Sequence, residues 1–287
     1  AWVAVGERVV AVVAGAPPVP VDVRQLVGRR GAVAVAVDAH VALDEGTVDV
    51  RVIGGFDAGR EVTVAMQIRN NDLGEITSYN IIGDMTGSER PDEVVITGGH
   101  IDAWDTGVGA MDDGMGVAIT MNAVSMIGAL PRRPARTLRF VAFGAEELGL
   151  LGAKAYAEEY AEIDHVFGIE SDFGIGKVWR LSPAVAEGAK PVLGEIATLL
   201  EPMGIGWDPG ARGFPGPDLV PLVTDTGLAG ASLNGDGTFY FDLHHTANDV
   251  LAQVNPEDLA FNVAAYVSFV YFTAETDAVF GPLAASD

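Results

Sequence analysis

The sequence contains no cysteine, few basic residues and no apolar run long enough to cross a bilayer. Because cysteine is absent, disulfide bonds and thiolate metal sites are excluded, and a metal would need histidine, aspartate or glutamate as ligands. Lysine and arginine number 17 against 40 acidic residues, and the formal net charge is −23. This charge argues against nucleic acid or an anionic membrane as a partner. The most apolar stretches, 9–16 and 259–272, are shorter than the roughly 18 residues of a membrane-spanning helix, so we expect no membrane insertion.

The 287 residues allow one large domain, or one domain and a small accessory unit. Residues 1–75 are rich in valine, alanine and glycine, and their short β-type runs between turn residues predict a β-rich unit. From about residue 78 strands alternate with helices, which predicts an α/β domain over 76–287 with a mostly parallel sheet between helices. The predicted strands are 9–13, 32–37, 48–53, 61–68, 79–85, 93–97, 137–143, 166–170 and 229–233. The predicted helices are 114–130, 147–160, 191–200 and 256 to about 280.

The stretch VVITGGHIDAWDTGVGAMDD, residues 94–113, carries the strongest chemical signal. An apolar strand ends in two glycines and is followed by His100 and Asp102, and then by Asp112 and Asp113. In an open α/β sheet, ligands collect outside the carboxyl ends of the strands. Asp102 is well placed to accept the second N–H of the His100 imidazole, leaving the other ring nitrogen for a metal. The stretch therefore predicts a metal site.

Two further strands are also followed by candidate ligands. Glu146 and Glu147 come directly after the apolar run LRFVAFGA, and Asp172 follows the next strand. The pair His244–His245 lies within about a dozen residues after a fourth strand. Burying adjacent carboxylates is costly without a counter-charge, and a divalent metal would supply it. The candidates exceed what one tetrahedral zinc can use, so we expect a two-metal site.

The segments GGHIDAWDTGVGAMDDGMG, AFGAEELG, GIESD and HHTAND, in this order, resemble those of the co-catalytic zinc exopeptidases. This family includes bacterial zinc aminopeptidases and the plasma glutamate carboxypeptidase (carboxypeptidase Q) branch, which the motifs resemble most. The resemblance runs from about residue 77 to the C-terminus and implies the zinc exopeptidase fold. It also implies that residues 1–75 are part of a protease-associated domain, a lid inserted into the catalytic domain, and that an N-terminal portion of the family chain lies outside this sequence.

The resemblance implies two zinc ions per chain and a role for each matching residue. Asp112 would bridge both ions and Glu146 would be the general base that accepts a proton from the bridging water. One ion would also be held by His100 and Asp172, and the other by Glu147 and His245.

Four further residues receive weaker assignments. His244 stands where many relatives have a tyrosine that donates a hydrogen bond to the tetrahedral oxyanion, and we expect His244 to supply this donor. Asp102 and Asp113 are expected to support the metal ligands. Asp218, in the loop GFPGPDLVP, matches a family position near the substrate. The isolated His40 and His165 are expected to have no chemical role.

Three functions remain open. The favoured one is a zinc-dependent exopeptidase that hydrolyses short peptides or dipeptides at a terminus, with either aminopeptidase or carboxypeptidase specificity. The second is a glutaminyl-cyclase-like acyltransferase, which shares the fold but uses one zinc. The third is a catalytically inactive, receptor-type binding domain. The resemblance also implies a secreted, periplasmic or cell-envelope protein and a homodimer, although this sequence contains no signal peptide pattern.

Overall fold

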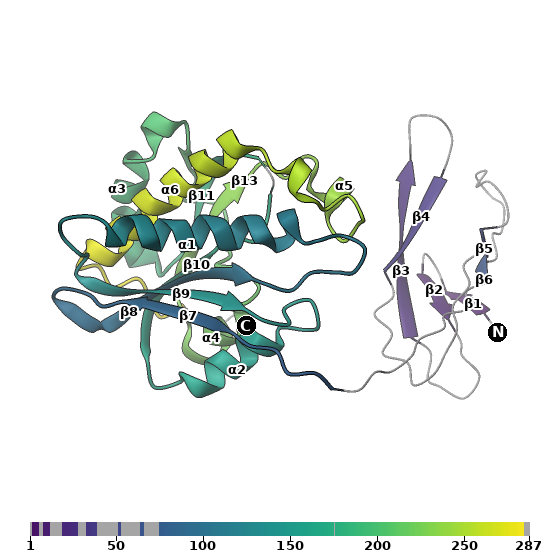
Figure 1. The fold of residues 1–287 in the computed structure, drawn as a ribbon, viewed down its shortest axis with the longest axis horizontal. Helices are drawn as coiled ribbons and strands as arrows, with labels where there is room; N and C mark the ends of the chain where they lie inside the picture. The colour runs from purple at the N-terminus through teal and green to yellow at the C-terminus, as the bar shows by residue number, and fades with distance from the viewer. Residues whose placement is uncertain are drawn as a thin grey trace. The chain divides into compact units, whose positions relative to one another are not determined.

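The computed structural model describes residues 75–174 and 176–283 in full and, of residues 1–74, the backbone of six strands. The chain divides into two compact units, Ala1–Ile76 and Thr77–Asp287, which are described separately (Figure 1).

Every helix or strand described in the first unit is a β-strand. One antiparallel sheet has the order β1-β2-β3-β4, and β5 pairs with β6. The strands are β1 (Trp2–Val5), β2 (Arg8–Ala11), β3 (Val19–Val27), β4 (Val33–Asp38), β5 (Arg51–Val52) and β6 (Val64–Ala65). The sequence pattern missed β1 and β3, and β3 contains Pro20, a residue that argues against a strand interior. His40 lies outside the described residues.

The second unit is built on a seven-stranded sheet of order β12-β11-β13-β10-β8-β9-β7. Its strands are β7 (Ile81–Met85), β8 (Arg90–His100), β9 (Arg136–Phe143), β10 (Asp164–Glu170), β11 (Val178–Ala184), β12 (Gly206–Trp207) and β13 (Gly230–Gly235). The four central strands, β13, β10, β8 and β9, are parallel. The neighbouring strands β7 and β11 run antiparallel to them. The predicted mixed, mostly parallel sheet is therefore confirmed.

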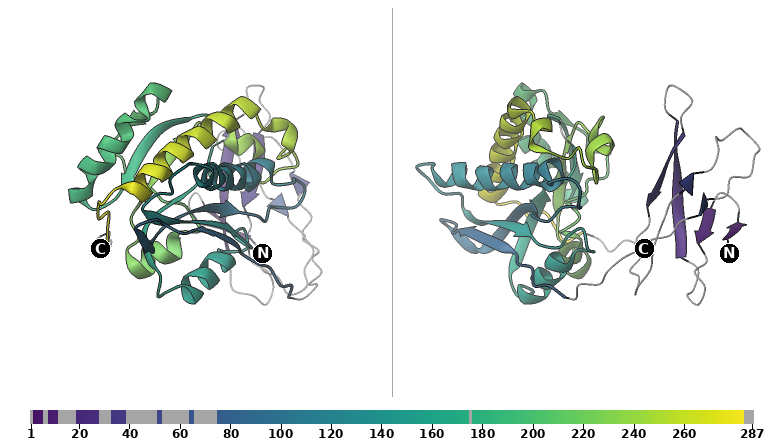
Figure 2. Two further views of the ribbon diagram at one scale, coloured as in Figure 1. Left: turned by 60° about the vertical axis from the view of Figure 1, so that its left-hand side comes forward. Right: turned by 45° about the vertical axis from the view of Figure 1, so that its right-hand side comes forward.

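Helices cover both faces of this sheet (Figures 1 and 2). One core layer joins the sheet to α1, α3 and α6, and a second joins it to α2 and α4. The helices are α1 (Met115–Gly128), α2 (Leu151–Glu159), α3 (Lys190–Thr198), α4 (Val220–Thr226), α5 (Tyr240–Leu243) and α6 (Pro256–Glu275). The short helical segments are η1 (Ala110–Gly114), which is a π-helix, and the 3-10 helices η2 (Glu187–Ala189), η3 (Glu201–Met203) and η4 (Leu251–Gln253). Every residue of β9 is buried, as expected for a strand covered on both faces.

The first two predicted helices differ from the structure. The helix predicted over 114–130 is α1. The prediction that it is buried on nearly every face is wrong, because Met121 is 49% and Met126 53% exposed on one face. The helix predicted from residue 147 begins at Leu151. The preceding residues form a turn in which Ala145 and Leu150 have left-handed φ values of 59° and 60°. This turn holds Glu146 and Glu147 outside the helix.

The last helix ends earlier than predicted, at Glu275. Arg90 donates to the main-chain carbonyls of Glu275 and Thr276, and Arg136 donates to those of Thr273 and Ala278. Guanidinium groups thus satisfy the carbonyls that an α-helix leaves free at its C-terminus. Among the described residues, no helix combines the length and the apolar composition that crossing a bilayer would require.

Candidate metal centre

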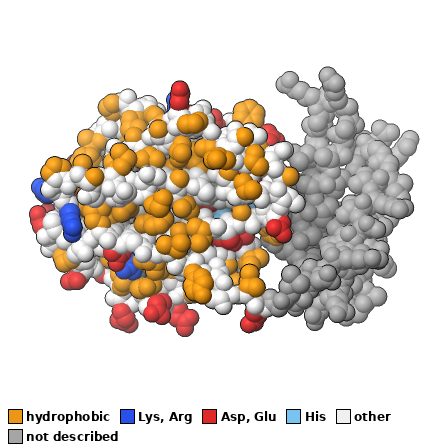
Figure 3. Space-filling view, in the orientation of Figure 1, with side chains coloured by type: hydrophobic (Ala, Val, Ile, Leu, Met, Phe, Trp, Pro, Cys, Tyr) orange, Lys and Arg blue, Asp and Glu red, His pale blue; other side chains and the backbone are white. Residues whose placement is uncertain are grey.

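The candidate ligands meet at the carboxyl ends of three adjacent parallel strands. His100 is the last residue of β8, Glu146 and Glu147 follow β9, and Asp172 follows β10. Because β9, β8 and β10 are parallel neighbours, these side chains reach the same edge of the sheet. His244 and His245 come from the loop after α5. Histidine and carboxylate surfaces lie side by side in the space-filling view (Figure 3).

Asp112 lies between two groups of side chains. Its Oδ1 atom is 3.1 Å from His100 Nε2, and its Oδ2 atom is 3.2 Å from His245 Nε2. His100 Nε2 is also 3.4 Å from Asp172 Oδ1, and His245 Nε2 is 3.0 Å from Glu147 Oε2. Each oxygen of one carboxylate thus faces a different histidine, and a second carboxylate joins each side.

The residues of this cluster fit divalent metal ions. Sets of candidate ligand atoms from His100, Asp112 and Glu147, and from Asp112 and His245 with His244, lie within 4.8 Å of one another. Asp112 Oδ2 and Glu147 Oε1 are buried without a hydrogen-bond partner among the described residues. Unpaired buried carboxylate oxygens are costly unless a cation binds them. A set of histidine nitrogens and carboxylate oxygens without thiolates suits zinc.

The electrostatics of the cluster favour the binding of cations. Burial, reinforced by neighbouring carboxylates, raises the pKa of Glu146 to about 7 and that of Glu147 to about 8. Burial alone would lower the pKa of His100, but the carboxylates of Asp102, Asp112 and Asp172 outweigh burial and raise it. A cluster so rich in negative charge is stabilised by cations.

Asp102 supports both sides of the cluster. Its main-chain carbonyl accepts the Nδ1–H of His100 at 2.9 Å, while its carboxylate is 3.7 Å from the same nitrogen. The carboxylate instead accepts the main-chain N–H groups of Glu146 (2.9 Å) and Glu147 (3.2 Å). Asp102 therefore fixes the orientation of His100 through its backbone and the turn that carries the two glutamates through its side chain.

Asp113 and Asp249 hold the main chain around Asp112. The buried Asp113 carboxylate accepts the N–H groups of His100 and Gly116, both at 3.1 Å. Asp249 is 3% exposed and accepts the N–H groups of Met111 (2.6 Å) and Asp112 (3.2 Å). Sequence reasoning missed Asp249. The available signal was its place in HHTAND, four residues after His245.

His244 lies beside the cluster. Its ring stacks on that of His245, with centroids 3.5 Å apart and planes at 22°, and its Nε2 atom is 3.4 Å from Asp112 Oδ2. Tyr240 and Phe241 contact the ring of His244, with centroid distances of 5.0 and 5.6 Å. The imidazole is 27% exposed, so it can meet a bound molecule.

Asp218 is as fully buried as His100 of the metal cluster. It is 1% exposed, and its main-chain N–H donates to Glu170 Oε2 at 3.0 Å. Burial raises the pKa of Asp218 to about 7, and burial together with the nearby Asp218 carboxylate raises that of Glu170. The two acids form a buried pair at the end of the loop 213–218.

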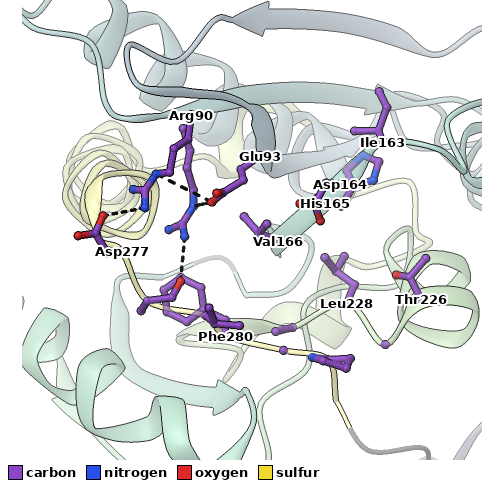
Figure 4. Close-up of a pocket in the computed structure, with 17 residues that line it drawn as sticks. Arg90, Glu93, Ile163, Asp164, His165, Val166, Thr226, Leu228, Asp277 and Phe280 are labelled. Atoms are coloured by element: carbon purple, nitrogen blue, oxygen red, sulfur yellow. Dashed lines mark hydrogen bonds and ion pairs between the residues drawn. The ribbon is translucent and has the colours of Figure 1, made fainter.

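A cavity of about 530 Å³ lies at the other end of the sheet. Arg90 and Glu93 at the start of β8, Asp164 and His165 at the start of β10, and Phe280 line it (Figure 4). His100 stands at the opposite end of β8, so this cavity is separate from the metal cluster. His165 accepts a hydrogen bond from Tyr156 at 2.7 Å.

Known proteins match the part of the chain that holds the cluster. Carboxypeptidase Q of Bos taurus is 32% identical over 221 residues, 76% of this chain and 46% of the relative, so the chain spans about half the length of that protein. The crystal structure of a peptidase M28 precursor from Shewanella amazonensis SB2B has a TM-score of 0.71 at 42% identity, covering 79% of this chain and 51% of that one.

A zinc aminopeptidase from Bacillus subtilis has a TM-score of 0.56 at 24% identity, over 78% of this chain and 58% of that one. This third likeness concerns the fold alone. The model of peptidase family M28 matches residues 80–270, a range that contains every candidate metal ligand. The chain belongs to peptidase family M28.

Proposed function

We propose that the chain is the catalytic part of a zinc-dependent exopeptidase that hydrolyses short peptides or dipeptides. The observation that carries this proposal is the position of Asp112, whose two carboxylate oxygens face His100 on one side and His245 on the other at 3.1 and 3.2 Å. A carboxylate shared in this way suits a pair of metal ions, which in hydrolases of this type lie roughly 3.5 to 4 Å apart. Membership of peptidase family M28 supports the reaction class.

Five residues would hold two zinc ions. Asp112 would be shared, His100 and Asp172 would complete one set of ligands, and Glu147 and His245 the other. The alternative ligand Asp113, which lies with His100 and Asp172 in one group, already accepts two main-chain N–H groups and is assigned a supporting role. Two zinc ions, when bound, would lower the pKa of a shared water and polarise the substrate carbonyl.

Glu146 would be the general base. The Asp102 carboxylate accepts the main-chain N–H of Glu146. The Glu146 carboxylate makes no hydrogen bond or ion pair with any described residue, so the Glu146 carboxylate is free to meet water. We assign two steps to this carboxylate. It would accept the proton that the attacking water releases, and it would later donate that proton to the leaving amine. Such proton transfer typically contributes 10²- to 10⁴-fold to the rate.

His244 would donate a hydrogen bond to the oxyanion that forms at the cleaved carbonyl. Its position beside Asp112 and its partial exposure support this role. The stack with His245 and the contacts with Tyr240 and Phe241 restrain the ring. Donors held in advance of the reaction are the effective ones.

The runner-up function, a glutaminyl-cyclase-like acyltransferase, requires one zinc. The histidine and carboxylate on each side of Asp112, His100 with Asp172 and His245 with Glu147, favour the peptidase. An inactive receptor-type domain is disfavoured because all five candidate ligand residues are present. Metal analysis together with a panel of free, N-blocked and C-amidated dipeptides tests the choice. Two zinc ions and hydrolysis of an unblocked dipeptide support the peptidase, whereas one zinc with no hydrolysis would contradict it.

For residues 1–75 we propose part of a protease-associated-type domain. The elements described in this region, β1 to β6, are all β-strands, and this supports the assignment. Expression of residues 77–287 alone tests a lid role. Removal of a lid is expected to change KM for small peptides without changing zinc content.

A further inference from the structure

Glu146 and Glu147 lie on a turn that joins β9 to α2. The turn runs from Gly144, directly after β9, to Gly152 near the start of α2. The Glu146 carboxylate makes no hydrogen bond or ion pair with any described residue, so contacts of its own side chain do not fix its position. The place of this carboxylate therefore depends on how the backbone of the turn is held.

Asn80 joins the two ends of this turn, Gly144 and Gly152, which we call its neck. The Oδ1 atom of Asn80 accepts the main-chain N–H of Gly144 at 3.0 Å, and its Nδ2 atom donates to the main-chain carbonyl of Gly152 at 2.9 Å. The two glycines also bond to each other, since the Gly152 N–H donates to the Gly144 carbonyl at 2.9 Å. An amide carries an acceptor and a donor on one planar group, so a single side chain closes the neck.

The neck is packed too closely for any residue with a side chain. A Cβ atom on Gly152 would collide with Asn80 Oδ1 and with the Gly144 carbonyl. A Cβ atom on Gly144 would lie 2.6 Å from the Tyr79 carbonyl. Both positions therefore need glycine, and the close approach that glycine allows brings the Asn80 amide within hydrogen-bond distance of both ends of the turn.

Asn80 is itself held by the sheet. It comes directly before β7, whose first residue, Ile81, pairs with Ala142 of the antiparallel strand β9 (Figure 1). Every residue of β9 is buried, so the backbone beside Asn80 is tied to a strand of the core. Asn80 is also partly buried, and water competes less for its hydrogen bonds than it would at the surface.

Asp102 holds the middle of the turn, whereas Asn80 holds its ends. The Asp102 carboxylate accepts the main-chain N–H groups of Glu146 and Glu147. Loss of the Asn80 amide would leave these two bonds in place and would allow the ends of the turn to move about them. Both glutamate carboxylates would then lose their fixed distance from the rest of the metal cluster.

We propose that Asn80 is a positioning residue for the general base Glu146 and the metal ligand Glu147. This inference rests on the peptidase function proposed above for the roles of the two glutamates. It adds a residue whose side chain bonds to the backbone of the turn alone. A misplacement of about 1 Å in a reacting group can cost about 10²-fold in rate. Opening the neck should therefore lower kcat, whereas KM should change little.

The test compares Asn80→Ala with two matched controls, using hydrolysis of an unblocked dipeptide by the zinc-loaded full chain. We expect Asn80→Ala to lower kcat by about 10- to 100-fold and to change KM by less than about threefold. Asn122→Ala makes the same substitution at an exposed residue of α1 whose Nδ2 also donates to a main-chain carbonyl. Ser88→Ala removes a hydroxyl that donates to the main-chain carbonyls of Arg133 and Pro134, in the loop before β9. Both controls should keep the wild-type kcat.

Asn80→Asp separates the two hydrogen bonds of the amide. Ionised aspartate has nearly the same size and keeps an acceptor for the Gly144 N–H, but it cannot donate to the Gly152 carbonyl. We expect kcat of Asn80→Asp to fall by about 10- to 100-fold as well. Because this variant leaves no space unfilled, a folded Asn80→Asp protein tests the inference even if Asn80→Ala does not fold.

A second measurement does not depend on hydrolysis. Hydrogen exchange followed by mass spectrometry should show faster exchange across residues 144–152 in the Asn80 variants, and wild-type exchange there in Ser88→Ala. Unchanged exchange across 144–152, a wild-type kcat in the Asn80 variants, or an equal fall of kcat in Asn122→Ala would overturn the inference. If the wild type hydrolyses no peptide while the Asn80 variants exchange faster across 144–152, the proposed reaction fails and Asn80 stands as the residue that holds the turn.

Discussion

Asp249 holds the backbone of Asp112 through a hydrogen bond of 3.2 Å from the Asp112 N–H to Oδ2, and its Oδ1 atom accepts the N–H of Met111 at 2.6 Å. Asp249 lies four residues after His245. One short loop therefore carries His245, a proposed ligand of one zinc ion, and Asp249, which holds the backbone of the proposed shared ligand Asp112. This link makes the geometry of Asp112 depend on a residue that need not touch a metal.

Replacing Asp249 by alanine should therefore weaken zinc binding. Removing a residue that orients a metal ligand typically costs 10- to 100-fold in affinity, and two main-chain N–H groups would lose their partner. Asp249→Asn keeps one accepting oxygen and should lie between the wild type and Asp249→Ala. Competition with a chelator measures the affinities. Asp225→Ala, an exposed acid on α4, is the control, and an equal loss there would contradict the role of Asp249.

Glu146→Gln should reduce kcat by about 10²- to 10⁴-fold, because the amide cannot accept the proton of water. Zinc content and the melting temperature should stay close to those of the wild type. Glu158→Gln, on the exposed side of α2, should leave kcat unchanged. Loss of zinc from Glu146→Gln would instead make Glu146 a ligand, and an unchanged kcat would remove it from the mechanism.

Variants of the neighbouring His244 and His245 should differ in zinc content. His245→Ala is expected to retain one zinc ion and to lose activity, because it removes a ligand. His244→Ala should retain both ions and lose about 10²- to 10³-fold in kcat, as expected for loss of an oxyanion donor. Elemental analysis of the purified variants gives the ratio of zinc to protein. A kcat of His244→Ala within a few-fold of the wild type would exclude the donor role.

His165 should make the folded chain less stable in mild acid. Burial, followed by the nearby Arg139 guanidinium, lowers its pKa from 6.5 to about 4, while Tyr156 donates to its Nε2 atom. Between these pH values the unfolded chain binds a proton that the folded chain does not, so stability falls as pH falls from 6.5 to 4. The loss reaches roughly 3 kcal/mol.

His165→Gln keeps an acceptor for Tyr156 and cannot titrate in this range. Its free energy of unfolding in urea should therefore fall less between pH 6.5 and 4 than that of the wild type. Identical pH profiles for the two proteins would show that His165 is protonated equally in the folded and unfolded states.

The parts of the fold that the sequence predicts well are those with a local signature. The strand before His100 is a continuous apolar run, and Glu146 and Glu147 also follow such a run directly. β11 was not predicted, because Arg180, Ser182 and Pro183 interrupt its apolar residues. The clamp of Asp249 on Asp112 and the bond from Asn80 to Gly152 join residues 137 and 72 positions apart. Such contacts arise only when the sheet assembles, so no spacing in the sequence signals them.

The most direct measurement is the rate of hydrolysis of an unblocked dipeptide while zinc is added to chelator-treated protein. Two ligand sets around Asp112 predict that activity rises to a plateau at two zinc ions per chain. A plateau at one zinc ion per chain, or no hydrolysis of any small peptide by fully loaded protein, would contradict a shared two-zinc centre.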